Sequence, residues 1–104
     1  MSPEDRARAL QEAKIARQVR AFHKEEVRKG TLTIGDIFNI SENNSAVAKM
    51  RVIELLESIP GYGKVRAHTL MERSAISPTR RIQGLGRHQR AALLQEFVLP
   101  RSRQ

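Results

Sequence analysis

Apolar side chains recur at intervals of three and four residues along most of the sequence, and this spacing predicts helices rather than strands. A long first helix is expected between Ser2, which forms a capping-box-like pattern with Asp5, and Gly30, where the helix should end. Strand-like alternation, internal repeats and low-complexity tracts are absent from the sequence. The expected fold class is therefore all-α.

The first helix is expected to have one docking face and one charged face. At about 100° per residue, Ile15, Val19 and Phe22 share a face that should dock against the rest of the chain. Before Ile15 the only large apolar side chain within the helix is Leu10, so the N-terminal half of the helix should project or fray. The opposite face carries five cations, Lys14, Arg17, Arg20, Lys24 and Arg28.

Thr33 and Asp36 predict the start of a short helix that ends near Asn39, and the polar run 41–45 leads to another helix start. Two amphipathic helices should then pack on either side of a turn. Their apolar faces are formed before the turn by Val52, Leu55, Leu56 and Ile59, and after it by Val65, Ala67, Leu70 and Met71.

Ser77 and Pro78 predict the cap and first turn of a further short helix through Ile82. The Gly-Leu-Gly run at 84–86 should end it before a final helix at 87–97, whose core side chains are Leu93, Leu94 and Phe97. The expected organisation is a long basic helix at 1–30, a small helical domain at 31–98 and a flexible basic tail at 99–104.

Composition limits the chemistry. With 104 residues and 39% hydrophobic content, the chain can form one domain with a small core. It has no cysteine, and its three histidines are scattered, so neither a metal site nor another cofactor is expected. His68 is expected to be a partly buried packing residue. Only four aromatic side chains are present, which disfavours a stacking platform for single strands and favours a duplex target.

The charge is positive and unevenly distributed. The chain has 19 Lys and Arg against 11 Asp and Glu, for a net charge of +8. Residues 1–30 carry +3, residues 31–59 carry −2 and residues 60–104 carry +7, so the excess begins near the turn. Such a surface favours a polyanionic partner. Because no apolar run reaches membrane-spanning length and no signal-peptide pattern is present, a soluble cytoplasmic protein is expected.

The turn itself, within Ile-Pro-Gly-Tyr-Gly-Lys-Val-Arg-Ala at 59–67, has the features of a phosphate site. Gly61 and Gly63 permit unusual backbone angles and a close ligand approach, while the amides that open the next helix are unpaired. Lys64 and Arg66 add full charges there. Pro-Gly-x-Gly is also an ordinary helix connection, so both interpretations stay open. Tyr62 could lie on a sugar or simply cover the turn.

One ordered set of residues indicates a family. It consists of Lys49-Met50-Arg51-Val52, Leu55-Leu56, Ile59-Pro60-Gly61, Gly63-Lys64, Arg66-Ala67, Met71, Ile76, Arg80-Arg81-Ile82, Gly84-Leu85-Gly86, Gln89, Leu93-Leu94 and Phe97. This set closely resembles the actinobacterial-type integration host factor, and the resemblance extends over residues 4–97. That family is all-helical, and its C-terminal part is similar to the helix-two-turns-helix module of a small-subunit ribosomal protein and of some DNA-repair enzymes.

The resemblance implies a nucleoid-associated protein that binds double-stranded DNA with little sequence preference and bends it. It implies roles in chromosome compaction and in site-specific recombination with phage integrase complexes. An oligomer is not implied, so a monomer is expected, and no catalysis is expected. The implied phosphate contacts at the minor-groove edge are Pro60, Gly61, Gly63, Lys64 and Arg66. Arg80 and Arg81 would form a second basic contact, with Arg87 and Arg90 compensating for Gln83, which stands where the family usually has a basic residue.

Several alternatives remain at this point. The cations Arg17, Arg20, Lys24 and Arg28 either follow a second stretch of DNA or form a solvated face. Arg80 and Arg81 could instead pair with Glu72 or Glu96 and cap carbonyl groups at helix ends. A ribosomal-type module that binds structured RNA is the second functional candidate. A repair enzyme is disfavoured, because the chain is too short for this module plus a base-sized catalytic pocket.

Overall fold

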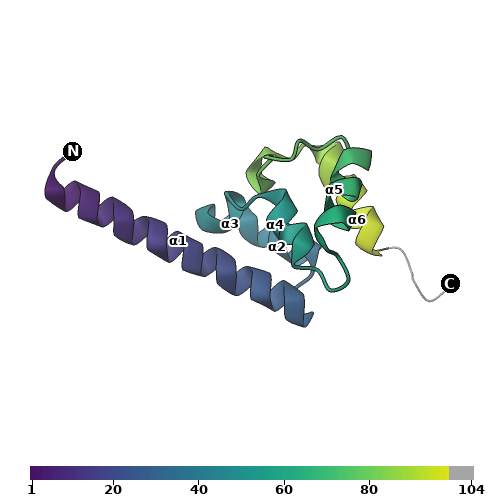
Figure 1. Cartoon of the computed structure of the whole chain (residues 1–104), viewed down its shortest axis with the longest axis horizontal. Helices are drawn as coiled ribbons and strands as arrows, with labels where there is room; N and C mark the ends of the chain where they lie inside the picture. Colours follow the sequence, from purple (N-terminus) through teal and green to yellow (C-terminus); the bar gives the residue numbers. More distant parts are fainter. Residues whose placement is uncertain (99–104) are drawn as a thin grey trace.

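The computed structural model describes residues 1–98, which form six α-helices and one 3-10 helix (Figure 1). The elements are α1 (Pro3–Lys29), α2 (Ile34–Ser41), α3 (Ser45–Ala48), α4 (Val52–Glu57), α5 (Lys64–Arg73), η1 (Ile82–Gly84) and α6 (Arg87–Val98). The prediction of an all-α fold with a long first helix is confirmed, since the one β-type pairing in this part of the chain is an isolated bridge. The predicted basic tail, 99–104, lies outside the described residues.

α1 begins and ends at the predicted residues. The Asp5 amide donates to the Ser2 hydroxyl at 3.1 Å, and the Asp5 carboxylate accepts the Ser2 amide, which completes a capping box. Hydrogen bonding to Ser2 and to Arg8 lowers the pKa of the Asp5 carboxyl. At the other end, Gly30 has φ +86, a conformation that favours glycine. Local hydrogen bonds therefore fix both ends of this helix.

The face of α1 that docks differs from the predicted one. Ile15 and Phe22 are 48% and 59% exposed, whereas Val27 is 4% exposed and Val19 packs against the core. The docking face is therefore rotated around the helix by roughly a quarter turn, at about 100° per residue. The reason is that the domain covers only the C-terminal part of α1, where Val27 supplies the deepest apolar contact.

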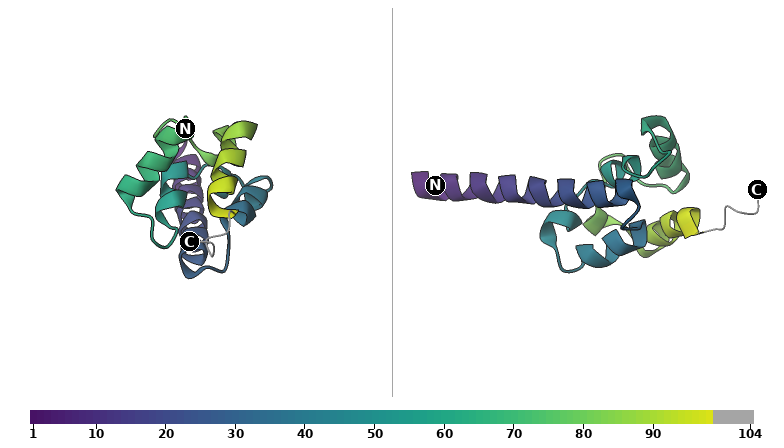
Figure 2. Two further views of the ribbon diagram at one scale, coloured as in Figure 1. Left: turned by 90° about the vertical axis from the view of Figure 1, so that its right-hand side faces the viewer. Right: turned by 90° about the horizontal axis from the view of Figure 1, so that it is seen from below.

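The N-terminal half of α1 projects from the domain as a regular helix (Figures 1 and 2). Every residue from 1 to 15 is exposed. The longest dimension of the molecule is 58 Å, about twice the other two at 27 and 25 Å. Of the two predicted behaviours for this half, projecting or fraying, the structure shows the first.

One apolar cluster holds the remaining elements together. Its fully buried side chains include Ile37, Val52, Leu55, Ile82 and Leu93. α4 and α5 pack against each other across the turn, as predicted. Two predictions on α5 are wrong: Val65 is 82% exposed and His68 is also exposed. The buried face of α5 starts only at Ala67, because the first turn of the helix extends beyond the core.

The short helix predicted from Ser77 to Ile82 is not formed. Residues 77–80 make a turn in which the Arg80 amide donates to the Ser77 carbonyl at 3.0 Å. Residues 80–82 then pair with residues 50–52 through two backbone hydrogen bonds of 2.9 Å, and only η1 is helical. These long-range hydrogen bonds hold the backbone extended, so they override the local Ser-Pro helix signal. The predicted final helix is confirmed as α6.

Candidate nucleic-acid interface

The hairpin, residues 59–63, connects α4 to α5 and uses its two glycines differently. Gly61 has φ +87, a left-handed conformation that other residues adopt at a cost. Gly63 has φ −96 and ψ −172, which is ordinary extended backbone, so the expectation of an unusual angle there is wrong. A Cβ atom added to Gly63 would meet nothing within 4 Å. The protein itself therefore does not require glycine at position 63, and the backbone there is open to a ligand.

The N-terminus of α5 is open as well. Gly63 is its N-cap and provides no side-chain hydrogen bond, and the first helical bond is donated by Ala67 to the Gly63 carbonyl at 3.0 Å. The amides of residues 64–66 precede that bond and point toward solvent, as the first amides of a helix do. They add the partial positive charge of the helix dipole to a surface that already lacks acidic side chains in the first turn.

The two cations in the first turn of α5, Lys64 and Arg66, are both exposed. Arg66 is held in place, because its guanidinium lies 4.2 Å from the centre of the Tyr62 ring and donates to the Gly61 carbonyl at 3.2 Å. Within residues 1–98, neither cation forms an ion pair with an acidic side chain. Their charges thus remain available to an external anion.

Tyr62 covers the turn rather than presenting itself to a partner. It is 7% exposed, its ring centre lies 5.1 Å from that of Phe97, and its hydroxyl donates to Glu96 Oε2 at 3.2 Å. The other oxygen of Glu96 accepts from Arg73 at 3.4 Å. This chain of contacts ties the hairpin to α6, so the open backbone at Gly63 sits on a supported corner.

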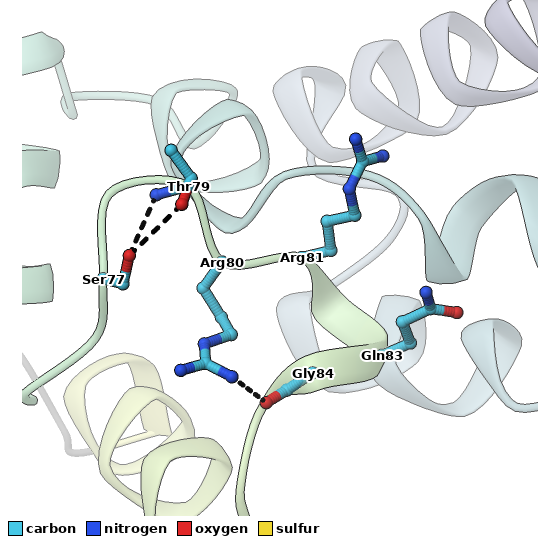
Figure 3. Close-up of a pocket in the computed structure, with 6 residues that line it drawn as sticks. All are labelled: Ser77, Thr79, Arg80, Arg81, Gln83 and Gly84. Carbon is cyan, nitrogen blue, oxygen red and sulfur yellow. Dashed lines mark hydrogen bonds between the residues drawn. The ribbon is translucent and has the colours of Figure 1, made fainter.

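The second predicted basic contact, Arg80 and Arg81, lies in the segment before η1, and the two side chains lie on opposite sides of that segment. Arg80 and Arg81 line a pocket of about 330 Å³ with Ser77, Thr79, Gln83 and Gly84, but their side chains project in opposite directions (Figure 3). Arg80 donates to the Gly84 carbonyl at 3.1 Å and Arg81 donates to the Lys49 carbonyl at 2.8 Å. Neither pairs with Glu72 or Glu96, so of the structural alternatives only the capping of carbonyls is present.

Arg87 and Arg90, the other two predicted contacts, have different surroundings. Arg90 is half-buried, donates to the Ile82 carbonyl at 3.2 Å and lies over the Phe38 ring at 5.2 Å. It therefore joins η1 to α2. Arg87 is exposed at the first position of α6.

The cations of α1 do not form one stripe. Arg20 donates to the Ala46 carbonyl at 3.3 Å, and Lys24 pairs with Glu54 at 3.2 Å, so both face the domain. Arg17 is exposed, and Arg28 is exposed beside Glu25. Because the docking face is rotated around α1, Arg20 and Lys24 lie against the domain and not on the opposite, charged face where they were expected. Arg51, which was not predicted as a site residue, lies opposite Arg81 on the bridge, and its position in the string Lys49-Met50-Arg51-Val52 was the available signal.

In the part of the chain that the structure describes, no cluster of three or more metal-binding side chains occurs. Among the same residues, no helix has both the length and the apolar character needed to cross a lipid bilayer.

Two helices joined by a supported hairpin, followed by a turn and a closing helix, define a helix-two-turns-helix module. Residues 27–97 match the family described as the S13-like H2TH domain, and the chain belongs to that family.

Relatives that match nearly the whole chain identify a more specific family. The chain is 43% identical over 97 residues to the integration host factor of Streptomyces coelicolor, covering 93% of this chain and 91% of that protein. It is 40% identical over 97 residues to the integration host factor of Mycobacterium tuberculosis, covering 93% and 92%. A solved structure of sIHF bound to an 8-bp palindromic DNA matches with a TM-score of 0.81 and 41% identity, over 84% of this chain and 98% of that one. The chain is therefore a member of the integration host factor family, as its residues predicted.

Proposed function

We propose that this protein binds double-stranded DNA through the sugar-phosphate backbone and bends it, as a nucleoid-associated protein. The observation that carries the proposal is the corner at Gly63, where open helix amides, unpaired cations and an unobstructed backbone coincide. The likeness to a family member solved with DNA supports the choice of ligand. The proposed roles are chromosome compaction and site-specific recombination.

The proposed mechanism starts from a phosphate at the N-terminus of α5. The amides of residues 64–66 donate to its oxygens, and Lys64 adds a full charge. The proposed position of this phosphate is at the edge of the minor groove. Every nucleotide carries the same phosphate, so these contacts position the duplex without identifying bases. Since Arg66 is already held against Tyr62 and Gly61, its charge is placed without further ordering of the side chain.

The proposed contact residues follow from exposure and direction. The hairpin supplies Pro60, Gly61 and Gly63, and the first turn of α5 supplies Lys64 and Arg66. The segment before η1 supplies Arg81. On α1, Arg17 and Arg28 are the exposed members of the predicted stripe and are candidates for a second stretch of DNA. Contacts at separate places favour a bent duplex when their gain exceeds the deformation energy, which is about 1–6 kcal/mol for a smooth bend.

The remaining parts of the proposal are the protein's state and setting. It acts as a monomer in the cytoplasm, at the nucleoid, and assists phage integrase complexes by bending DNA without catalysing a step. Incubation with duplexes that contain uracil or abasic sites should leave the strands intact. Strand cleavage by the purified protein would contradict the architectural role.

The backbone contact can be tested by a salt titration. Anisotropy of a labelled duplex should show log affinity falling linearly with log salt, at a slope of roughly −0.9 per phosphate neutralised. Lys64→Ala should weaken binding to unrelated sequences equally and make the slope shallower by about one. Arg6→Ala is the matched control, because Arg6 is an exposed cation near the far end of α1 and its loss changes the net charge equally.

Equal weakening by both variants, or an affinity that ignores salt, would contradict a contact at the hairpin. Fluorescence transfer between the ends of the duplex should rise on binding if the DNA bends, and an unchanged signal in a saturated complex would refute bending. Competition of the duplex against structured RNA at fixed salt tests the second candidate function, and we expect the duplex to compete better.

A further inference from the structure

Arg51 and Arg81 lie directly opposite each other on the antiparallel bridge between the start of α4 and the segment before η1. Two backbone hydrogen bonds, each 2.9 Å long, flank the pair and join residues 50–52 to residues 80–82. In this pattern the two central residues form a non-hydrogen-bonded pair, whose Cα atoms are about 4.5 Å apart and whose side chains stand on the same face. The bridge therefore brings together two arginines that are thirty positions apart in the sequence.

This placement is unfavourable for the isolated protein. Like charges directly opposite each other on paired strands destabilise the pairing. Both side chains are exposed, and within residues 1–98 neither forms an ion pair that would relieve the repulsion. The exposed Lys49 adds a third positive charge two positions before Arg51. An anion placed between the two guanidinium groups would turn this repulsion into attraction.

The hydrogen-bonding capacity of the pair suits a phosphate. One nitrogen of Arg81 donates to the Lys49 carbonyl at 2.8 Å, which orients its guanidinium and leaves its other donors free. Among the described residues, no hydrogen bond involves the Arg51 side chain. A guanidinium matches two phosphate oxygens at once, so the pair can hold one phosphate from two directions. Arg80 has no part in this site, because it projects to the other side of the segment (Figure 3).

The pair and the hairpin lie at opposite ends of α4. Arg51 immediately precedes this helix and the hairpin follows it, and its six residues extend over about 9 Å at 1.5 Å per residue. A phosphate held by Arg51 and Arg81 is therefore a different phosphate from the one at Gly63. We infer that Arg51 and Arg81 together bind a second phosphodiester group of the same duplex, an inference that rests on the proposed DNA-binding function.

Two effects of opposite sign should identify this site. Arg51→Gln removes one of the two facing charges and leaves the Arg81 hydrogen bond to Lys49 intact. The melting temperature should therefore rise by about one to a few degrees. In the same variant, the affinity for a duplex should fall by roughly three- to tenfold, and the salt slope should become shallower by about one. A residue with a purely structural role would lower both quantities or neither.

Arg6→Gln provides the control for net charge and should change both quantities little. Arg51→Gln and Lys64→Ala should have additive effects on affinity, because separate contacts without shared partners act independently. If Lys64→Ala weakens binding and Arg51→Gln does not, the second site is refuted while the proposed function stands. If neither variant weakens binding, the hairpin contact of the proposed function is refuted together with this site.

The identity of the anion can be tested on the wild-type protein. The side-chain Nε–H signals of Arg51 and Arg81 in the NMR spectrum should shift when a duplex is added. Millimolar inorganic phosphate alone should leave them in place, because one small anion lacks the neighbouring contacts that hold the duplex. Equal shifts with inorganic phosphate would indicate a site for free anions and would overturn the assignment to DNA.

Discussion

The hairpin corner, residues 60–66, and the segment at residues 80–86 both combine two glycines with two basic side chains, yet their polar groups have different partners. At the corner, the N-terminus of α5 has no side-chain cap and Lys64 has no acidic partner. In the second segment, the amide of Gly86, which precedes α6, donates to the Gln89 side chain at 2.8 Å. Arg80 and Arg81 each donate to a carbonyl of the protein itself, as Arg66 does at the corner, so the difference lies in Lys64 and in the helix amides.

The difference indicates that glycine and arginine in a basic loop are not by themselves enough to predict a nucleic-acid contact. The two regions differ in how many of their hydrogen-bond donors already have an acceptor within the protein. The amides that open α5 have no partner among residues 1–98, whereas the amide of Gly86, the residue directly before α6, donates to a side chain. In the second segment the proposed DNA contact is Arg81, and the bridge places Arg51 beside it.

Gly61→Ala should have the largest effect on stability. Gly61 has φ +87, and a left-handed conformation costs a residue with a Cβ roughly 1–2 kcal/mol. Chemical denaturation should show a loss of that size, and DNA binding should weaken as the corner distorts. Gly63→Ala is the matched comparison within the same turn. Equal stability of the two variants would mean that φ at position 61 does not constrain the hairpin.

Gly63→Ala should separate binding from folding. The added methyl meets nothing within 4 Å, so the free energy of unfolding should change by less than about 0.5 kcal/mol. Duplex affinity should nevertheless fall by roughly tenfold, about the loss of one charge-assisted hydrogen bond, because the methyl group blocks the approach of a phosphate. An unchanged affinity in the anisotropy titration would move the phosphate away from this corner.

Gly84→Ala should have the smallest effect and provides the test on the second segment. The new Cβ would lie 3.0 Å from Cδ of Arg80, and this flexible side chain can move aside at the cost of its bond to the Gly84 carbonyl. Stability should fall by about 0.5 kcal/mol or less, and duplex affinity should change by less than about twofold. A tenfold loss of affinity would show that Arg80 contacts DNA from its present position.

Features set by local hydrogen bonds could be predicted from the sequence. Thr33 and Asp36 exchange side-chain and backbone hydrogen bonds at the start of α2, as the capping pattern indicated. Gly30 likewise ends α1 where expected. The corner could also be predicted, because Gly61, Gly63 and Lys64 are adjacent in sequence and a turn followed by a helix start is a local arrangement.

Features set by contacts between distant residues could not be predicted in this way. The face of α1 that docks depends on where the domain ends along the helix, so Val27 is buried and Ile15 is not. The pairing of residues 50–52 with residues 80–82 depends on the fold, and it decides that Arg81 stands beside Arg51 while Arg80 turns the other way. Neighbouring arginines in the sequence were expected to act together and are separated by the alternation of an extended backbone.

The exposed outer half of α1 has a consequence for how the melting of this protein is measured. Residues 3–15 bury nothing against the domain, and a free helix of that length is marginal in water. On heating, this arm should lose ellipticity gradually while the domain melts in a cooperative step. A two-state fit to the total far-ultraviolet signal would assign part of the gradual loss to the baseline, whereas near-ultraviolet absorption of Tyr62, buried beside Phe97, follows the domain alone.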